Sequence, residues 1–306
     1  MTDIHALAKE AGFAESFILP VLPYTDWTRH REDGVFHPNA DPLASDPRTA
    51  YPWANAVVIC MLPYVPYTDE SLVASYYPAS NRGYHAMKRL LSMLREQGIR
   101  ACRAETPYRE QLASYGIGAR MDNQLLYYAP YGTYINLQGA VAALPEPVEY
   151  EPHRDPQEIC NHCGVCGKDC FGAIKGNGGF DWSRCIHTYL EGEPIPTDAM
   201  EWLPSLFGCM KCQKSCPKNP DFAVPIPDEI LETLDLVRIL KGNRKEAGEW
   251  IGTNLAAPNR LLRQAIVLAA NRGMIEALPY LYALRETYGE RFRAELDYAI
   301  TLLQKE

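Results

Sequence analysis

The sequence lacks any long hydrophobic run. No uninterrupted apolar stretch approaches the roughly 20 residues that a transmembrane helix needs, and the first thirty residues contain no apolar segment of the signal-peptide type. Basic residues are in the minority, with 30 Lys and Arg against 38 Asp and Glu, so the formal net charge is -8. This balance argues against a broad polyanion-binding surface. We therefore expect no membrane partner and a cytoplasmic location.

Cysteine, in contrast, is concentrated in one stretch of the chain. Eight of the ten cysteines fall between Cys160 and Pro217. They form a C-x2-C-x2-C-x3-C run, then a single cysteine, then a C-x2-C-x3-C-P run. Each iron of a [4Fe-4S] cubane binds one thiolate, and three cysteines spaced by two residues can wrap one loop around three corners. The fourth thiolate must then come from elsewhere in the chain.

The spacing therefore predicts a bacterial ferredoxin-like module with two [4Fe-4S] clusters. In two-cluster ferredoxins, the last cysteine of each run binds the other cluster. By the same rule, the predicted ligands of the first cluster are Cys160, Cys163, Cys166 and Cys216. Those of the second cluster are Cys170, Cys185, Cys209 and Cys212.

Two other interpretations of the cysteines are weaker. A zinc ribbon uses four thiolates from paired C-x2-C knuckles, which gives no reason for a third cysteine two residues further on. Disulfides would require an oxidising compartment, and the sequence contains no signal for one. Outside the run, Cys60 and Cys102 lie in apolar surroundings and are interpreted as ordinary core residues.

The flanking sequence predicts three domains: an α/β or α+β domain at 1–147, the double-cluster module at 148–225 and a helical HEAT-like layer at 226–306. The first domain is expected to be irregular over 1–50 after a short helix, and its sheet is expected to be mixed in direction. Its predicted elements are strands at 56–62 and near 99–104, helices at 83–97 and 107–115, and a hairpin of strands 124–129 and 133–137.

The last 80 residues read as successive helices that begin after Asp228, a plausible N-cap. Their expected ranges are 229–240, 245–251, 259–271, 275–288 and 291–304. A further feature is the tyrosine-rich loop that follows the first strand. Its tyrosines could pack as half-buried side chains or could line a pocket for a flat ligand. They are Tyr64, Tyr67, Tyr76 and Tyr77.

Several segments resemble epoxyqueuosine reductases and, more distantly, reductive dehalogenases. The matching motifs cover most of residues 50–272. They are Gly83-Tyr84-His85, R-E-Q-L-A-S-Y-G-I-G from Arg109, C-N-H-C-G-V-C-G-K-D-C-F-G-A-I from Cys160, D-W-S-R-C-I-H-T-Y from Asp181, 208–217 and the helix at 261–270. The resemblance implies a cobalamin-dependent iron–sulfur enzyme that performs the last step of queuosine synthesis on tRNA.

The resemblance also implies specific partners and site residues. A base-off cobalamin is expected over the first cluster, with the second cluster relaying electrons inward from a low-potential ferredoxin or flavodoxin. The protein is expected to be a monomer. The cofactor-binding candidates are Tyr84, His85, Gly116, Gly118 and Asn123. For tRNA, the candidate phosphate contacts are Lys211, Lys214, Lys218, Arg238, Lys241, Arg244, Lys245, Arg260 and Arg263, which could equally be cations on solvated faces.

The catalytic candidates are Glu105, Arg109 and Asp122, and here the sequence departs from the family. Glu105 replaces the family's aspartate in a segment that is three residues shorter, whereas Arg109 matches the family's arginine. The loop after Gly118 also loses the family's tryptophan. The substrate is therefore epoxyqueuosine in tRNA or a different molecule. Glu105 and Arg109 could also be only a surface i, i+4 ion pair. The alternative functions are a non-catalytic double-cluster electron carrier or partner subunit and a zinc-stabilised binding module.

Overall fold

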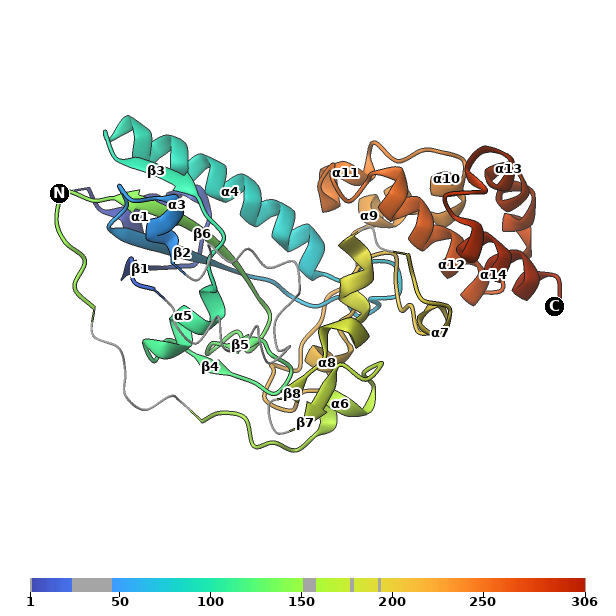
Figure 1. The fold of residues 1–306 in the computed structure, drawn as a ribbon, viewed down its shortest axis with the longest axis horizontal. Helices are drawn as coiled ribbons and strands as arrows, with labels where there is room; N and C mark the ends of the chain where they lie inside the picture. The colour runs from blue at the N-terminus through green and yellow to red at the C-terminus, as the bar shows by residue number, and fades with distance from the viewer. Residues whose placement is uncertain (1, 24–45, 151–157, 177–178, 192–193, 306) are drawn as a thin grey trace. The chain divides into compact units, whose positions relative to one another are not determined.

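The chain divides into two compact units (Figure 1). The computed structural model describes residues 2–23, 46–150, 158–176, 179–191 and 194–305. The first unit comprises Met1–Tyr64, Arg82–Trp182 and Lys211–Asp221. The second unit comprises Val65–Asn81, Ser183–Met210 and Phe222–Glu306. Each unit therefore joins segments that are far apart in the sequence, and the division into three domains stays a prediction.

A four-stranded sheet forms the framework of the first unit. Its strands, in spatial order, are β1 (Glu15–Pro20), β2 (Ala56–Pro63), β6 (Ile135–Ala143) and β3 (Arg100–Arg103). All three neighbouring pairs are antiparallel, so the expectation of a mixed sheet is wrong. The expectation of irregular structure over 1–50 is also wrong at β1, while 24–45 lie outside the described residues. The sequence did not predict β1, because most of its residues are half-buried and its apolar and polar residues do not clearly alternate.

β2 is a continuous apolar run because both of its faces are covered. α1 (Ile4–Ala11) and α4 (Tyr76–Glu96) pack on one face, and α5 (Tyr108–Ser114) contributes to the other. The predicted short helix, buried strand and α5 are thus confirmed. α4 begins seven residues before the predicted 83, with Pro78 in its first turn, where the missing N–H is tolerated. It ends as predicted before Gly98, whose φ of 75° suits glycine.

The predicted hairpin of strands 124–129 and 133–137 is wrong in its pairing. β5 (Leu126–Tyr127) pairs with β4 (Ala119–Arg120), whereas β6 pairs with β2 and β3. A single bridge between Tyr128 and Gly132 is the remnant of that hairpin among the described pairings. The physical reason is that both edges of β6 are already occupied, so β5 must find its hydrogen bonds with an earlier segment.

The tyrosines between β2 and the body of α4 are packed side chains. Tyr64, Tyr67 and Tyr77 are only 5%, 6% and 6% exposed, respectively. Tyr76 and Tyr77 belong to the first turn of α4, so the loop is shorter than expected. This burial supports the packing interpretation of the tyrosines over the interpretation as a ligand pocket.

Successive helices form most of the second unit, as predicted (Figure 1). They are α9 (Asp228–Thr233), α10 (Leu236–Leu240), α11 (Ala247–Ile251), a π-helical turn (Pro258–Leu262), α12 (Arg263–Asn271), α13 (Leu278–Tyr288) and α14 (Arg293–Leu303). α12 is buried over nearly its whole length and contacts α10 and α14. The HEAT-like packing stays a prediction. Among the described residues, we find no helix with the length and apolarity needed to cross a membrane.

Two details of the predicted helices are wrong. The expected helix at 229–240 is broken, because the Asp235 side chain accepts a hydrogen bond from the Arg238 N–H (2.8 Å) and so caps a new helix, α10. Asp228 is the first residue of α9 rather than its N-cap, which is Pro227.

Candidate metal centre

The first unit brings together the four cysteines predicted to hold the first cluster. Cys160 and Cys163 precede α6 (Val165–Lys168), Cys166 lies within it, and Cys216 follows α8 (Lys211–Lys214). α6 and α8 pack against each other. Burial, together with the nearby Asp122, Cys216, Cys160 and Cys163, raises the pKa of the Cys166 thiol to about 11. The four thiols are therefore neighbours, although Cys216 comes from a distant part of the chain.

The donor set of this quartet fits an iron–sulfur cluster. All four cysteines are free thiols with half-buried or exposed side chains. Thiolate sulfur is the ligand that iron in such clusters takes, and these four side chains can supply it. Both flanking helices have only four residues, so they add few hydrogen bonds of their own. The loops thus present four sulfur ligands on a backbone with little regular structure.

The other cysteines have different surroundings. Cys170 and Cys212 belong to the first unit, and Cys185 and Cys209 to the second unit. The second cluster therefore stays a prediction from the spacing alone. Cys60 is fully buried on β2, where burial raises its pKa to about 12, which confirms its interpretation as a core residue. Cys102 on β3 is only partly buried.

A polar network holds the second cysteine loop of the first unit in place. The buried Gln213 side chain donates to the Thr133 carbonyl oxygen (2.7 Å) and to the Tyr64 hydroxyl (3.0 Å). Asn219 donates to the Gln213 carbonyl oxygen (2.7 Å) and accepts from the Thr133 N–H (2.8 Å). The loop that carries Cys216 is thus attached to the start of β6. Sequence analysis missed Gln213, and its position between two cysteines is the only signal that could have drawn attention to it.

Two predicted site residues lie in the turn between β4 and β5 and contact the cysteine loops. The Asp122 carboxylate pairs with Nδ1 of His162 at 2.9 Å, and His162 lies between Cys160 and Cys163. Asn123 Nδ2 donates to the Cys212 carbonyl oxygen at 3.4 Å. Asp122 is 5% exposed, so its charge is buried beside the first quartet. His162 was also missed, because nothing in the sequence indicates that this turn reaches it.

The other two catalytic candidates lie in different surroundings. The Glu105 side chain is 77% exposed and forms an ion pair with Arg103 at 3.1 Å. Arg109 donates through Nη1 to the Gln124 carbonyl oxygen at 2.9 Å. The neighbouring Glu110, which sequence analysis overlooked, is a buried carboxylate and pairs with Arg120. Of the acidic residues in this region, Glu110 and Asp122 are buried and Glu105 is exposed.

The candidates for cofactor binding are not gathered by any described contact. Tyr84 is exposed on α4, where the Arg103 guanidinium lies 5.3 Å from its ring centre and the exposed His85 packs edge-on. Gly118 has a structural explanation, because a Cβ there would lie 2.4 Å from the Tyr127 carbonyl oxygen. Gly116 follows α5 with a φ of 71°, a left-handed conformation that glycine adopts readily. Their roles toward a cofactor stay predictions.

The basic residues proposed for tRNA contacts differ in accessibility. Lys214 and Lys218 are exposed beside Cys216, and Lys211 is half-buried. Arg263, in contrast, is buried in the second unit and its Nε lies 3.1 Å from a carboxylate oxygen of Glu295. The expectation that Arg263 contacts phosphates is wrong, because a buried guanidinium paired with a carboxylate cannot reach a phosphate.

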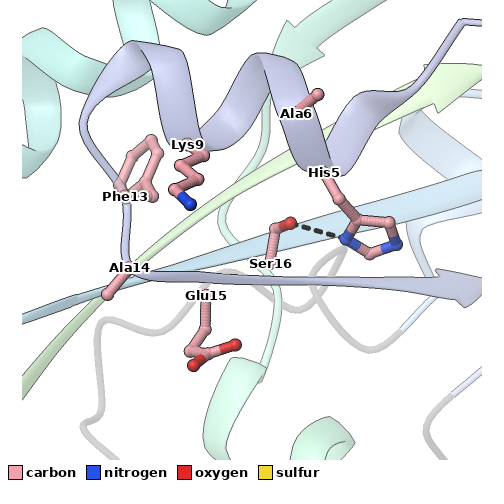
Figure 2. A pocket seen from close by; sticks show the side chains of 7 residues that line it. All are labelled: His5, Ala6, Lys9, Phe13, Ala14, Glu15 and Ser16. Carbon is pink, nitrogen blue, oxygen red and sulfur yellow. Dashed lines mark hydrogen bonds between the residues drawn. The ribbon is translucent and has the colours of Figure 1, made fainter.

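A separate pocket of about 260 Å³ lies between α1 and β1 (Figure 2). Its lining includes His5, Lys9 and Ser16, and the His5 ring and the Ser16 hydroxyl point toward each other with Nδ1 and Oγ at 2.8 Å. Glu15 points to the opposite side of the strand from Ser16. No cysteine lines this pocket, so it is separate from the quartet.

Comparisons with known proteins found epoxyqueuosine reductases and, among solved structures, reductive dehalogenases as well. No family model matches the chain. An epoxyqueuosine reductase from Staphylococcus aureus is 27% identical over 187 residues, which are 56% of this chain and 47% of the relative. The matched segments thus span less than half the length of such curated relatives.

Solved structures of this family share the fold along almost the whole chain. An epoxyqueuosine reductase from Streptococcus thermophilus matches with a TM-score of 0.77 and 19% identity, over 99% of this chain and 90% of that chain. Another, with an epoxyqueuosine-modified tRNA stem loop, matches with a TM-score of 0.70 and 19% identity, over 98% of both chains. A reductive dehalogenase matches with a TM-score of 0.50 and 16% identity, over 90% of this chain and 36% of that chain. The chain is therefore similar in sequence to epoxyqueuosine reductases over about half of its length, and it shares the fold of their solved structures and of the reductive dehalogenases.

Proposed function

We propose that this protein is an iron–sulfur, corrinoid-dependent reductase of the epoxyqueuosine reductase type. The observation that carries the proposal is that Cys160, Cys163 and Cys216, from two distant loops of the first unit, all lie near enough to Cys166 to contribute to the raised pKa of its thiol. Four thiolates from such loops are the ligands that a [4Fe-4S] cluster needs. The second cluster is proposed on Cys170, Cys185, Cys209 and Cys212 from their spacing. Electrons would come from an external low-potential donor such as ferredoxin or flavodoxin.

The corrinoid is proposed from the relation to the family. When bound, it would supply a low-potential metal centre that no amino-acid side chain can provide. The candidates to hold it remain Tyr84, His85, Gly116, Gly118 and Asn123, of which Asn123 contacts the loop of Cys212. The role of this chain would be to bind and orient the group and to exclude water from it. Since the described contacts do not gather these residues, we derive no chemical step through it.

The proposed substrate class is epoxyqueuosine in tRNA. Support comes from the family member whose structure contains an epoxyqueuosine-modified tRNA stem loop. The exposed Lys214 and Lys218 beside the cysteine loop are suitable phosphate contacts on an otherwise acidic chain. The exposed position of Glu105 gives it no part in a water-excluded site. Asp122, which is buried beside the quartet, is the better candidate for an acidic role.

Anaerobic reconstitution tests the metal content and the cofactor in sequence. We expect about eight irons and about eight sulfides per chain, as two cubanes require. Cobalamin is then offered to the reconstituted protein, and uptake with a base-off change in the corrin absorption spectrum is expected. A colourless protein that carries one zinc would contradict the cluster proposal, and full iron content without cobalamin uptake would contradict the corrinoid proposal.

The substrate proposal has its own test. Expression in a strain that lacks epoxyqueuosine reductase should restore queuosine in tRNA. A gel shift with epoxyqueuosine-modified tRNA at low and moderate salt should show binding that weakens when Lys214 and Lys218 are both changed to Ala, because each lost phosphate contact reduces the salt-dependent affinity. Lys88→Ala on α4 is the control cation. If the protein binds cobalamin but neither restores queuosine nor binds the modified tRNA, it acts on a different substrate.

A second candidate function is a non-catalytic electron carrier with two clusters. The exposed Glu105, which replaces the family's acid and pairs with Arg103, favours it. This candidate predicts reversible reduction of both clusters without cobalamin uptake. Binding of cobalamin would exclude it.

A further inference from the structure

The turn between β4 and β5, residues 121–124, contacts both cysteine loops of the first unit. Asp122 pairs with His162 in the first loop, and Asn123 donates to the Cys212 carbonyl oxygen in the second loop. Consecutive side chains of this turn therefore reach both loops. A displacement of this turn would therefore move the two loops, and with them the cysteines of the quartet, relative to each other.

Two arginines, one in α5 and one in β4, also hold this turn in place. Arg109 donates to the Gln124 carbonyl oxygen at 2.9 Å, and Arg120 donates to the Gln124 side-chain oxygen at 2.5 Å. Arg120 in turn pairs with the buried Glu110. Gln124 has a φ of 63°, a left-handed conformation that is unfavourable for a non-glycine residue and persists here because these contacts hold it.

Asp122 thus holds a fixed position at the edge of the first quartet. Ligating atoms of Asp122, Cys160 and His162 all lie within 4.8 Å of one another. His162 itself has a φ of 52°, so the turn between Cys160 and Cys163 depends on a second left-handed residue. The contact with Asp122 stabilises that conformation. Because Asp122 is 5% exposed, water screens its charge poorly.

We propose that Asp122 is a positioning residue for the first cluster and that its buried carboxylate lowers the reduction potential of that cluster. The inference rests on the proposed function, because it requires a cluster on Cys160, Cys163, Cys166 and Cys216. A fixed negative charge beside the cluster opposes the addition of an electron, and both net charge and hydrogen bonding are known to set cluster potentials. The Asp122 carboxylate is kept in place by Asn123 and by the contacts of Gln124 with Arg109 and Arg120, the latter paired with Glu110.

The test separates charge from position with three variants of the full chain. Asp122→Asn keeps the shape and an acceptor for His162 but removes the charge. Asp122→Ala removes both. Glu158→Gln is the matched control, since it removes an exposed carboxylate two residues before Cys160. The readouts are iron and sulfide content, circular dichroism and a dithionite titration followed by electron paramagnetic resonance.

For Asp122→Asn, we expect wild-type iron content and a shift of one of the two cluster midpoints to a more positive potential. Glu158→Gln should shift neither midpoint by as much, because solvent screens an exposed charge. Asp122→Ala should in addition lose iron to a chelator several-fold faster than wild type. His162→Gly, which permits the left-handed backbone but removes the contact, should also speed that loss without unfolding the exposed loop.

The outcomes distinguish this inference from the proposed function. If wild-type protein takes up no cluster, the proposed function fails and this inference fails with it. If wild-type protein is fully loaded but Asp122→Asn and Glu158→Gln have the same midpoints, the charge role is overturned and the cluster stands. If Asp122→Ala and His162→Gly release iron at the wild-type rate, the positioning role is overturned.

Discussion

The sheet and the cysteine loops of the first unit are held together by different kinds of contact. In the sheet, residues Ala56 to Met61 of β2 are completely buried between layers of apolar side chains. In the first cysteine loop, none of the residues 160–170 is buried, and the regular structure amounts to one four-residue helix. The sheet therefore carries its own hydrophobic core, whereas the loops rely on polar contacts and on whatever their thiols bind.

This difference explains why the polar contacts concentrate around the loops. Gln213, Asn123 and Asp122 each attach a cysteine loop to the sheet domain through a hydrogen bond or ion pair. In the loop 160–170, where no residue is buried, such contacts and the proposed cluster are the main sources of stability. The comparison predicts that changes to the loops affect cluster content and that changes to the sheet affect the free energy of unfolding.

The largest effect is expected for Cys216→Ser, which removes one thiolate of the first quartet. We expect a loss of about four of about eight irons per chain, because a cubane that lacks a corner ligand is released. The far-UV circular dichroism of the sheet domain should stay unchanged. The matched control is Cys60→Ser, which should keep all the iron. Full iron content in Cys216→Ser would remove Cys216 from the ligand set.

The next effect is expected in the sheet. Leu90→Ala on α4 should lower the free energy of unfolding by about 2–5 kcal/mol, because it leaves a cavity at a completely buried position. Denaturant unfolding measures this change, with the partly buried Leu91→Ala as the control that costs less. The iron content per folded chain should not change. A parallel loss of iron in Leu90→Ala would show that the sheet and the loops are not independent.

A smaller effect is expected at the junction of the two regions. Gln213→Ala leaves the polar groups of Thr133 and Tyr64 without a buried partner, which costs about 1–3 kcal/mol. We also expect faster iron release to a chelator, since the Cys216 loop loses its attachment to β6. The exposed Lys214→Ala is the control on the same short helix. Equal release rates for the two variants would contradict the role assigned to Gln213.

The smallest effect is expected for chemical modification of Cys60. Its pKa is raised to about 12 by burial, so the thiol is protonated below that pH and only a thiolate reacts with iodoacetamide. Native protein should therefore keep Cys60 unmodified between about pH 7 and 9, as peptide mass spectrometry can measure, while unfolded protein is modified. Rapid modification in the native state would show that the sheet opens.

Elements with a strong local pattern were predictable from the sequence. The apolar run of β2, the periodic leucines of α4 and the buried stripe of α12 were all recognised, because each pattern follows from the burial of one element. β1 and the pairing of β5 with β4 were not, since both depend on which strand edges are free. Glu105 was selected by motif position, but the structure exposes it to solvent and buries Glu110 and Asp122 instead.

The sequence by itself was enough to predict a ligand set, because three cysteines at a spacing of two residues can follow the corners of a cubane without knowledge of the rest of the fold. The tertiary structure alone decided which carboxylate and which amide accompany the thiols. Asp122 and His162 are 40 residues apart, and Gln213 and Thr133 are 80 residues apart, so their contacts arise only when the β4–β5 turn and the start of β6 fold against the cysteine loops. No local pattern records such long-range neighbours, because side-chain spacing along a chain reports only on one element at a time.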